Sequence, residues 1–107
     1  MPPIRRDISI VIPAGSDDEI LGDQVRAALR DRADDLESVE LLAMTAYRDL
    51  PEKARTRLQI MEDQANALIR ITLRPLAKTL TAGEANRIRD DIYRALHQGP
   101  VMELVAH

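Results

Sequence analysis

An alternating segment between Asn66 and Arg74 constrains the fold of this chain more than any other stretch. Every second residue is apolar, so one side of an extended segment would carry Ala67, Ile69, Ile71 and Leu73. The other side would carry Leu68, Arg70, Thr72 and Arg74. This period of two is typical of a half-buried strand. Pro75 lacks the N–H that a sheet requires, so the strand is expected to end there.

A capped amphipathic helix is predicted directly after this strand. Thr81 and Glu84 have the spacing of a capping box, in which each side chain binds the backbone N–H of the other residue. An apolar stripe at helical spacing then follows, formed by Ala85, Ile88, Ile92 and Leu96. A strand and a helix that covers it make one unit, which the rest of the chain must complete.

The first half of the chain predicts a similar unit. Residues from Arg5 to Ile12 alternate and Pro13 ends the run, which indicates a first strand. Ser16 or Asp17 can cap a helix that fades by Ala33, with an inward stripe of Ile20, Leu21, Val25, Ala28 and Leu29. A less regular apolar segment from Leu36 to Ala46 is expected to form a second strand. Residues 50–65 form an insert with a short helix that begins at Pro51, and Val101–Val105 is long enough for a fourth strand.

The predicted order is therefore β-α-β, insert, β-α-β. Two such units with right-handed crossovers give an α+β, ferredoxin-like βαββαβ sandwich. We expect one domain over residues 1–107, with a four-stranded antiparallel sheet, two helices on one face and an insert between strands 2 and 3. The opposite face of the sheet would be bare.

Composition narrows the classes of function. The chain has no cysteine, Phe or Trp, so thiolate chemistry is absent and the core is aliphatic. No apolar run approaches the roughly 20 residues of a membrane span, which favours a cytoplasmic protein without membrane contact. Residues 1–50 hold 6 Lys/Arg against 11 Asp/Glu, whereas residues 51–107 hold 9 against 7. Any affinity for a polyanion must therefore come from a local basic face.

Four segments, in order along the chain, resemble the ferredoxin-fold anticodon-binding domain at the C-terminal end of the phenylalanyl-tRNA synthetase beta subunit. They are Pro3–Ile8, Leu36–Leu41, Ile69–Arg74 and Thr79–Thr81 with Glu84 and Asn86. The resemblance implies a non-catalytic module, free-standing or excised from a larger chain, that contacts the anticodon region of a tRNA. The implied partners are tRNA, with phenylalanine tRNA as one candidate, and synthetase subunits or a second copy. It implies neither an enzyme nor a cofactor.

Two groups of basic residues are candidates for RNA contact. Arg5, Arg70 and Arg74 fall on outward positions of the two central strands, where guanidinium groups suit phosphate and can stack on bases. The alternative is a solvated face whose charge Asp7 partly neutralises. The second group is Arg48, Lys53, Arg55 and Arg57 in and before the insert, which could bind a phosphate or be an ordinary solvated helix face. Tyr47 either reaches the bare face or packs at the strand end.

No catalytic or metal-binding pattern is visible. His97 and His107 are the only histidines, and a metal site needs several convergent ligands. His97 is expected to interact with the helix dipole at a helix C-terminus. Two further functions stay open: a protein-interaction or oligomerisation module that uses the open sheet face, with Val11, Leu68, Leu42 and Met44 as its apolar members, and a small-ligand regulatory domain.

Overall fold

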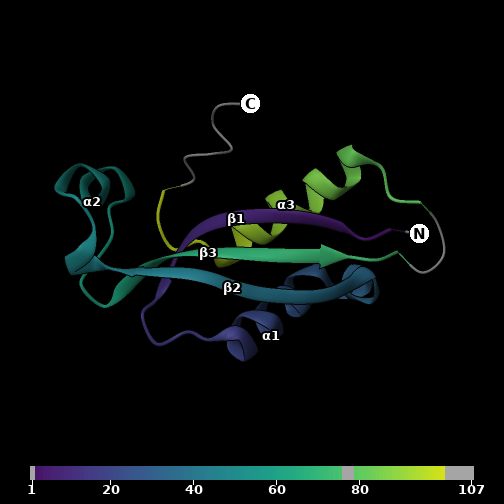
Figure 1. Ribbon diagram of the computed structural model, residues 1–107, viewed down its shortest axis with the longest axis horizontal. Coiled ribbons are helices and arrows are strands. Elements are labelled where there is room, and N and C mark those ends of the chain that lie inside the picture. The colour runs from purple at the N-terminus through teal and green to yellow at the C-terminus, as the bar shows by residue number, and fades with distance from the viewer. Residues whose placement is uncertain (1, 76–78, 101–107) are drawn as a thin grey trace.

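The computed structural model describes residues 2–75 and 79–100. The strands are β1 (Ile4–Pro13), β2 (Leu36–Ala46) and β3 (Gln64–Leu73), and the α-helices are α1 (Asp18–Leu29), α2 (Glu52–Leu58) and α3 (Ala82–Leu96). Short 3-10 helices, η1 (Arg30–Asp35) and η2 (Tyr47–Asp49), lie at the two ends of β2. Figure 1 shows the three strands running side by side along the length of the molecule.

The sheet is antiparallel throughout, with the order β1-β3-β2. The prediction of a four-stranded, ferredoxin-like sheet is therefore wrong for the part of the chain that the structure describes. The fourth strand expected at Val101–Val105 lies outside the described residues. At the outer edge of β1, Val11 donates its N–H to Nδ1 of His97 and accepts from the N–H of Gln98. The chain that leaves α3 thus meets this edge through a side chain and one backbone bond, not through a strand.

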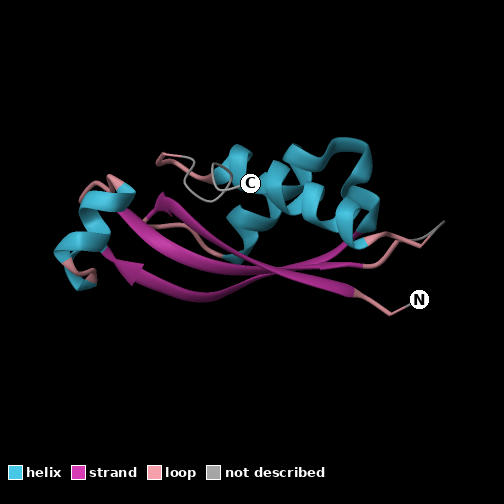
Figure 2. Cartoon of the chain, turned by 90° about the horizontal axis from the view of Figure 1, so that it is seen from above, coloured by secondary structure: helices cyan, strands magenta, loops and turns pink. Residues whose placement is uncertain are grey.

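Helices α1 and α3 both pack on one face of the sheet, as expected, and Figure 2 shows them on the same side of the strands. The predicted alternation is confirmed for β1 and β3, because one parity of each strand lies in the main core. The prediction that both are central strands is wrong for the described sheet, in which β3 is central and β1 lies at an edge. This core joins Ile8, Ile10, Ile12, Ala67, Ile69, Ile71 and Leu73 to the stripes of α1 and α3. The other parity faces away from the helices and forms what is here called the open face.

Helix α1 begins where the sequence predicts, because the Asp17 side chain accepts from the N–H of Ile20. Leu21, Val25 and Leu29 are buried, but Ile20 is 43% exposed, so its place in the inward stripe was wrongly predicted. Asp18 turns back to the sheet, and its Oδ1 accepts from the N–H of Leu41 at 2.8 Å. This bond ties the start of α1 to β2.

Helix α3 begins at the predicted capping box. The Thr81 Oγ1 accepts from the N–H of Glu84 at 3.1 Å, and Oε1 of Glu84 accepts from the N–H of Thr81 at 3.2 Å. The predicted stripe of Ala85, Ile88, Ile92 and Leu96 is buried. The box therefore determines where α3 begins, and the apolar stripe determines which of its faces meets the sheet.

The insert folds into a second, small hydrophobic cluster. Leu50 and Ile60, on either side of α2, pack with Val11 of β1. Val11 has the parity of the open face, yet none of its surface is exposed. The insert therefore covers the open face at the end of the sheet where α2 stands in Figure 1, and leaves the rest of that face bare.

Candidate functional site

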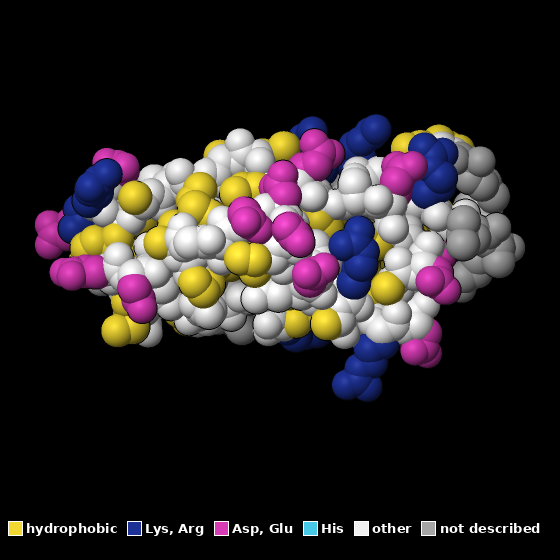
Figure 3. All heavy atoms as spheres, turned by 90° about the horizontal axis from the view of Figure 1, so that it is seen from below, with side chains coloured by type: hydrophobic (Ala, Val, Ile, Leu, Met, Phe, Trp, Pro, Cys, Tyr) yellow, Lys and Arg dark blue, Asp and Glu magenta, His cyan; other side chains and the backbone are white. Residues whose placement is uncertain are grey.

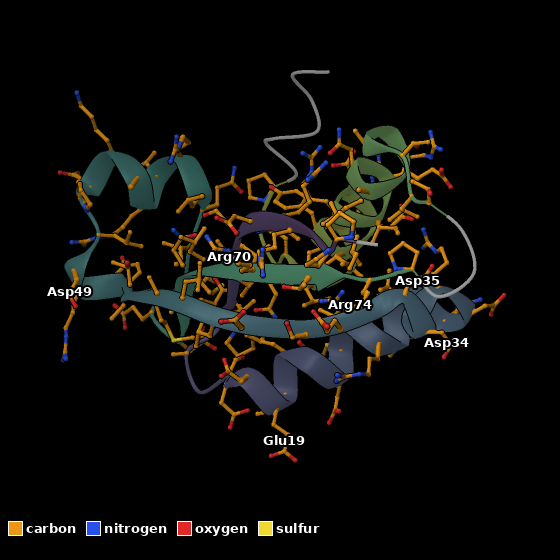
Figure 4. The ribbon with its side chains drawn as sticks, turned by 45° about the vertical axis from the view of Figure 1, so that its right-hand side comes forward. Glu19, Asp34, Asp35, Asp49, Arg70 and Arg74 are labelled. Atoms are coloured by element: carbon orange, nitrogen blue, oxygen red, sulfur yellow. The ribbon has the colours of Figure 1, made fainter. Side chains whose placement is uncertain are left out.

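Three predicted arginines lie together on the open face. Arg5 on β1 stands opposite Thr72 on β3, while Arg70 and Arg74 lie two positions before and after Thr72. Thr72 is only 3% exposed, although neither α1 nor α3 packs on this face. Figure 4 shows Arg70 on β3 and Arg74 just beyond the end of that strand. The register thus places these three arginines around one covered position.

Acidic side chains on the same face hold two of the three arginines. Arg70 donates from Nε to Oδ1 of Asp7 at 2.8 Å and from a terminal nitrogen to Oδ2 at 3.1 Å, a two-bond pairing of guanidinium and carboxylate. Arg74 donates from Nε to Glu37 at 2.8 Å. The prediction that Asp7 partly neutralises this face is confirmed. The pairing of Glu37 with Arg74 was not predicted.

The Arg70–Asp7 pair changes the titration of both groups. Hydrogen bonding from Arg70 holds the pKa of Asp7 below its ordinary value, and the charge of Arg70 adds to this shift. In return, the hydrogen bond and the charge of Asp7 raise the pKa of Arg70. Glu40 stands opposite Arg70 in the β2–β3 register and also favours the charged guanidinium, although by charge alone.

Arg5 differs from its two neighbours. Its side chain is exposed and makes no hydrogen bond or ion pair with any described residue. Arg6, the next residue, points to the helix side instead, where its Nε donates to Oδ1 of Asn86 on α3 at 2.9 Å. Among the arginines of the open face, Arg5 is therefore the one with a guanidinium available for a ligand.

The basic residues of the insert stand apart from this group, at the end of the sheet where β1 reaches Val11. Arg55 is not free, because its Nε donates to the Leu50 carbonyl at 2.9 Å and its guanidinium lies 4.8 Å from the centre of the Tyr47 ring. Arg48, Lys53 and Arg57 are exposed and make no hydrogen bond or ion pair with described residues. Lys53 and Arg57 in the insert and Arg48 just before it are thus exposed cations without a partner among the described residues, whereas Arg55 is a structural residue.

Tyr47 packs at the strand end, against the small cluster of the insert, and not in the middle of the open face. Beside it lies a hollow of about 470 Å³, lined by Ala14, Ala46, Tyr47, Arg48, Arg55, Glu62 and Gln64. It is large enough for a small polar ligand, and Tyr47 with Arg55 forms one of its walls. No local sequence pattern predicts this hollow, because its lining comes from four separate segments.

Apolar residues of the open face gather on one side of the arginines. A bulge in β2 sets Leu42 and Ala43 near Leu68 of β3. Leu68 is 37% exposed and Leu42 is 41% exposed, whereas Met44 packs against the main core and Val11 lies under the insert. Only two of the four predicted apolar residues, Leu42 and Leu68, are thus available on this face.

His97 has a structural role that the sequence did not predict. Its Nδ1 accepts from the Val11 N–H at 2.9 Å, so Nε2 carries the proton and donates to the Pro100 carbonyl at 2.9 Å. Its ring stacks on Tyr93 with the ring centres 4.6 Å apart. His97 therefore acts as a neutral acceptor for β1, not as a cation at the helix end.

Among the described residues, no three His, Asp or Glu side chains are placed so that they could hold one metal ion. None of the helices in the described residues has the length and apolar character needed to cross a membrane. No family model matches the sequence, and no curated protein is similar enough to count as a relative.

Proposed function

We propose that this chain is a non-catalytic tRNA-contacting module that uses the open face of its sheet. The observation that carries the proposal is the position of Arg5, Arg70 and Arg74 around Thr72, on the part of the open face that none of the described helices covers. These arginines lie in two of the segments that resemble the anticodon-binding domain. Guanidinium groups contact both phosphates and exposed bases, so such a group suits an RNA loop.

The distribution of charge supports an approach from this side. Exposed acidic side chains lie along the start of α1, and Figure 3 shows Asp and Glu side chains gathered on the side of the molecule that carries α1. An RNA backbone is repelled there and meets cations on the open face and on the insert. The free residues Arg48, Lys53 and Arg57 then serve as a secondary contact for the RNA backbone. The resemblance to a synthetase domain supports a cytoplasmic location as part of this proposal.

A titration with purified phenylalanine tRNA and with total tRNA, each at low and at physiological salt, tests this proposal. We expect a preference for phenylalanine tRNA that survives physiological salt. Arg70→Ala should weaken binding to phenylalanine tRNA and reduce the slope of log K against log salt for that tRNA by about one. Arg26→Ala, an exposed cation on α1, is the matched control. Weak binding to all tRNAs that disappears with salt, or an unchanged slope in Arg70→Ala, would contradict the proposal.

A second candidate function rests on the exposed pair Leu42 and Leu68. Two neighbouring leucines, each more than a third exposed, favour contact between this face and a second copy of the chain. Leu68→Glu would then convert a dimer into a monomer in sedimentation experiments, because the substitution places a charge in the contact. A wild-type protein that sediments as a monomer at high concentration would exclude this function.

A further inference from the structure

Arg70, on the open face, is already paired with a carboxylate. Arg70 binds Asp7 through two parallel hydrogen bonds of 2.8 and 3.1 Å, and both side chains are about 40% exposed. Asp7 occupies the side-on edge of the guanidinium, formed by Nε and one terminal nitrogen, and its charge already neutralises Arg70. A phosphate therefore reaches this edge, and meets an unneutralised cation, only when it displaces the carboxylate of Asp7.

We infer that Asp7 sets the selectivity of this face, by competing with phosphate for Arg70. The inference rests on the proposed function and concerns the same site. An isolated backbone phosphate gains little from Arg70, because it replaces one anion by another. An RNA that is already held by Arg5 and by a second contact presents its phosphate at high effective concentration and displaces Asp7. Asp7 thus lowers the affinity for a polyanion that touches only Arg70 more than it lowers the affinity for an RNA that is also held by other contacts.

Two other carboxylates lie on this face, Glu37 and Glu40. They make it possible to distinguish competition for hydrogen-bond donors from simple charge repulsion. Glu37 accepts from Nε of Arg74 at 2.8 Å, whereas Asp7 accepts two hydrogen bonds from Arg70. Glu40 stands opposite Arg70 across the β2–β3 pair but makes no hydrogen bond with it. Replacing Glu40 removes a negative charge near Arg70 without releasing a guanidinium N–H. Replacing Asp7 by Asn removes the same charge and also releases the N–H donor that the second carboxylate oxygen held, leaving a single neutral acceptor.

Asp7→Asn and Glu40→Gln are therefore the informative pair of variants. The probes are a short single-stranded RNA of mixed sequence and phenylalanine tRNA, each titrated over a range of salt concentrations. Asp7→Asn should bind the single strand about two- to fivefold more tightly, as expected for release of an exposed ion pair. Its salt slope should steepen by about 0.7, because one more phosphate is neutralised. Glu40→Gln should change the affinity slightly and leave the slope unchanged.

The double variant Asp7→Asn/Arg70→Ala shows whether the effect passes through Arg70. If Asp7 competes with phosphate, Asp7→Asn has almost no effect once Arg70 is absent, and the cycle reports a coupling between the two residues. The gain in affinity for phenylalanine tRNA should also be smaller than the gain for the single strand.

Three results would overturn the inference. An Asp7→Asn variant that binds RNA more weakly would mean that Asp7 positions Arg70 for the RNA. Equal effects of Asp7→Asn and Glu40→Gln on affinity and slope would mean that only the overall charge matters. Absence of RNA binding in every variant, at low salt, would remove the proposed function together with this inference, whereas the first two results leave the proposed function standing.

Discussion

The bond between Val11 and His97 gives the sharpest test of how the two ends of the chain are joined. Val11 is completely buried, and its N–H has Nδ1 of His97 as its acceptor at 2.9 Å. His97→Leu keeps an apolar side chain beside Tyr93 but leaves this N–H without a partner. A buried donor that loses its acceptor costs about 1–3 kcal/mol.

His97→Asn is the matched variant, because the amide oxygen of Asn can take nearly the position of Nδ1. Both variants lose the stacking on Tyr93 and the bond to Pro100, so the difference between them isolates the acceptor. We expect His97→Leu to be less stable than His97→Asn by about 1–3 kcal/mol. In a chain of this size, that difference corresponds to a melting temperature lower by roughly 4 °C or more.

Urea denaturation of the three proteins, read by far-UV circular dichroism, measures the difference if the m-values agree. Equal loss of stability in the two variants would refute the reasoning, since the acceptor would then contribute nothing and the ring itself would account for the effect. A smaller loss in His97→Leu than in His97→Asn would refute it more strongly.

Three further predictions concern the core, a helix start and acid stability. Leu21→Ala should lower the free energy of unfolding by about 2–5 kcal/mol because Leu21 is completely buried, whereas Ile20→Ala, at an exposed neighbouring position, should change it by less than about 1 kcal/mol; comparable losses would contradict the assigned face of α1. Thr81→Ala should destabilise the protein by about 1 kcal/mol in thermal unfolding, and Thr81→Ser should restore most of that loss because its hydroxyl can still accept from Glu84; a Ser variant as unstable as the Ala variant would show that the cap is not the cause. Because Arg70 lowers the pKa of Asp7 in the folded state, the pair stabilises the fold above the ordinary Asp pKa near 4 and this contribution disappears as the pH falls through the lowered value. Asp7→Asn should therefore flatten the decline of stability below about pH 4, as measured by denaturation at a series of pH values, and an unchanged decline would show that the pair does not contribute.

The sequence predicted best where a local pattern decides the structure. The period of two in β1 and β3 fixed which residues face the helices, and the Thr81–Glu84 pair fixed the start of α3. The second strand was less regular for a physical reason. Register shifts between Leu36 and Ser38, and again between Leu41 and Ala43, break the alternation, so a simple period fails.

Contacts between distant segments could not be predicted in the same way. Val11 and His97 are 86 positions apart, and nothing near either residue indicates the bond. The alternation of β3 predicted that Arg70 faces outward. The alternation of β1 likewise placed Asp7 on the outward side, which predicted that Asp7 partly neutralises this face. The structural use of Arg55 depends on the path of the insert, which no local pattern determines.

The small cluster of the insert has a consequence for the motions of the protein. Val11, Leu50 and Ile60 share no buried side chain with the main core, so the segment around α2 can unfold locally while the three strands stay paired. Three buried side chains resist this opening, against seventeen in the main core, and amide protons in α2 should therefore exchange with solvent sooner than those in the middle of β3. Each opening uncovers Val11 and lengthens the accessible part of the sheet, so that the extent of the open face varies with time.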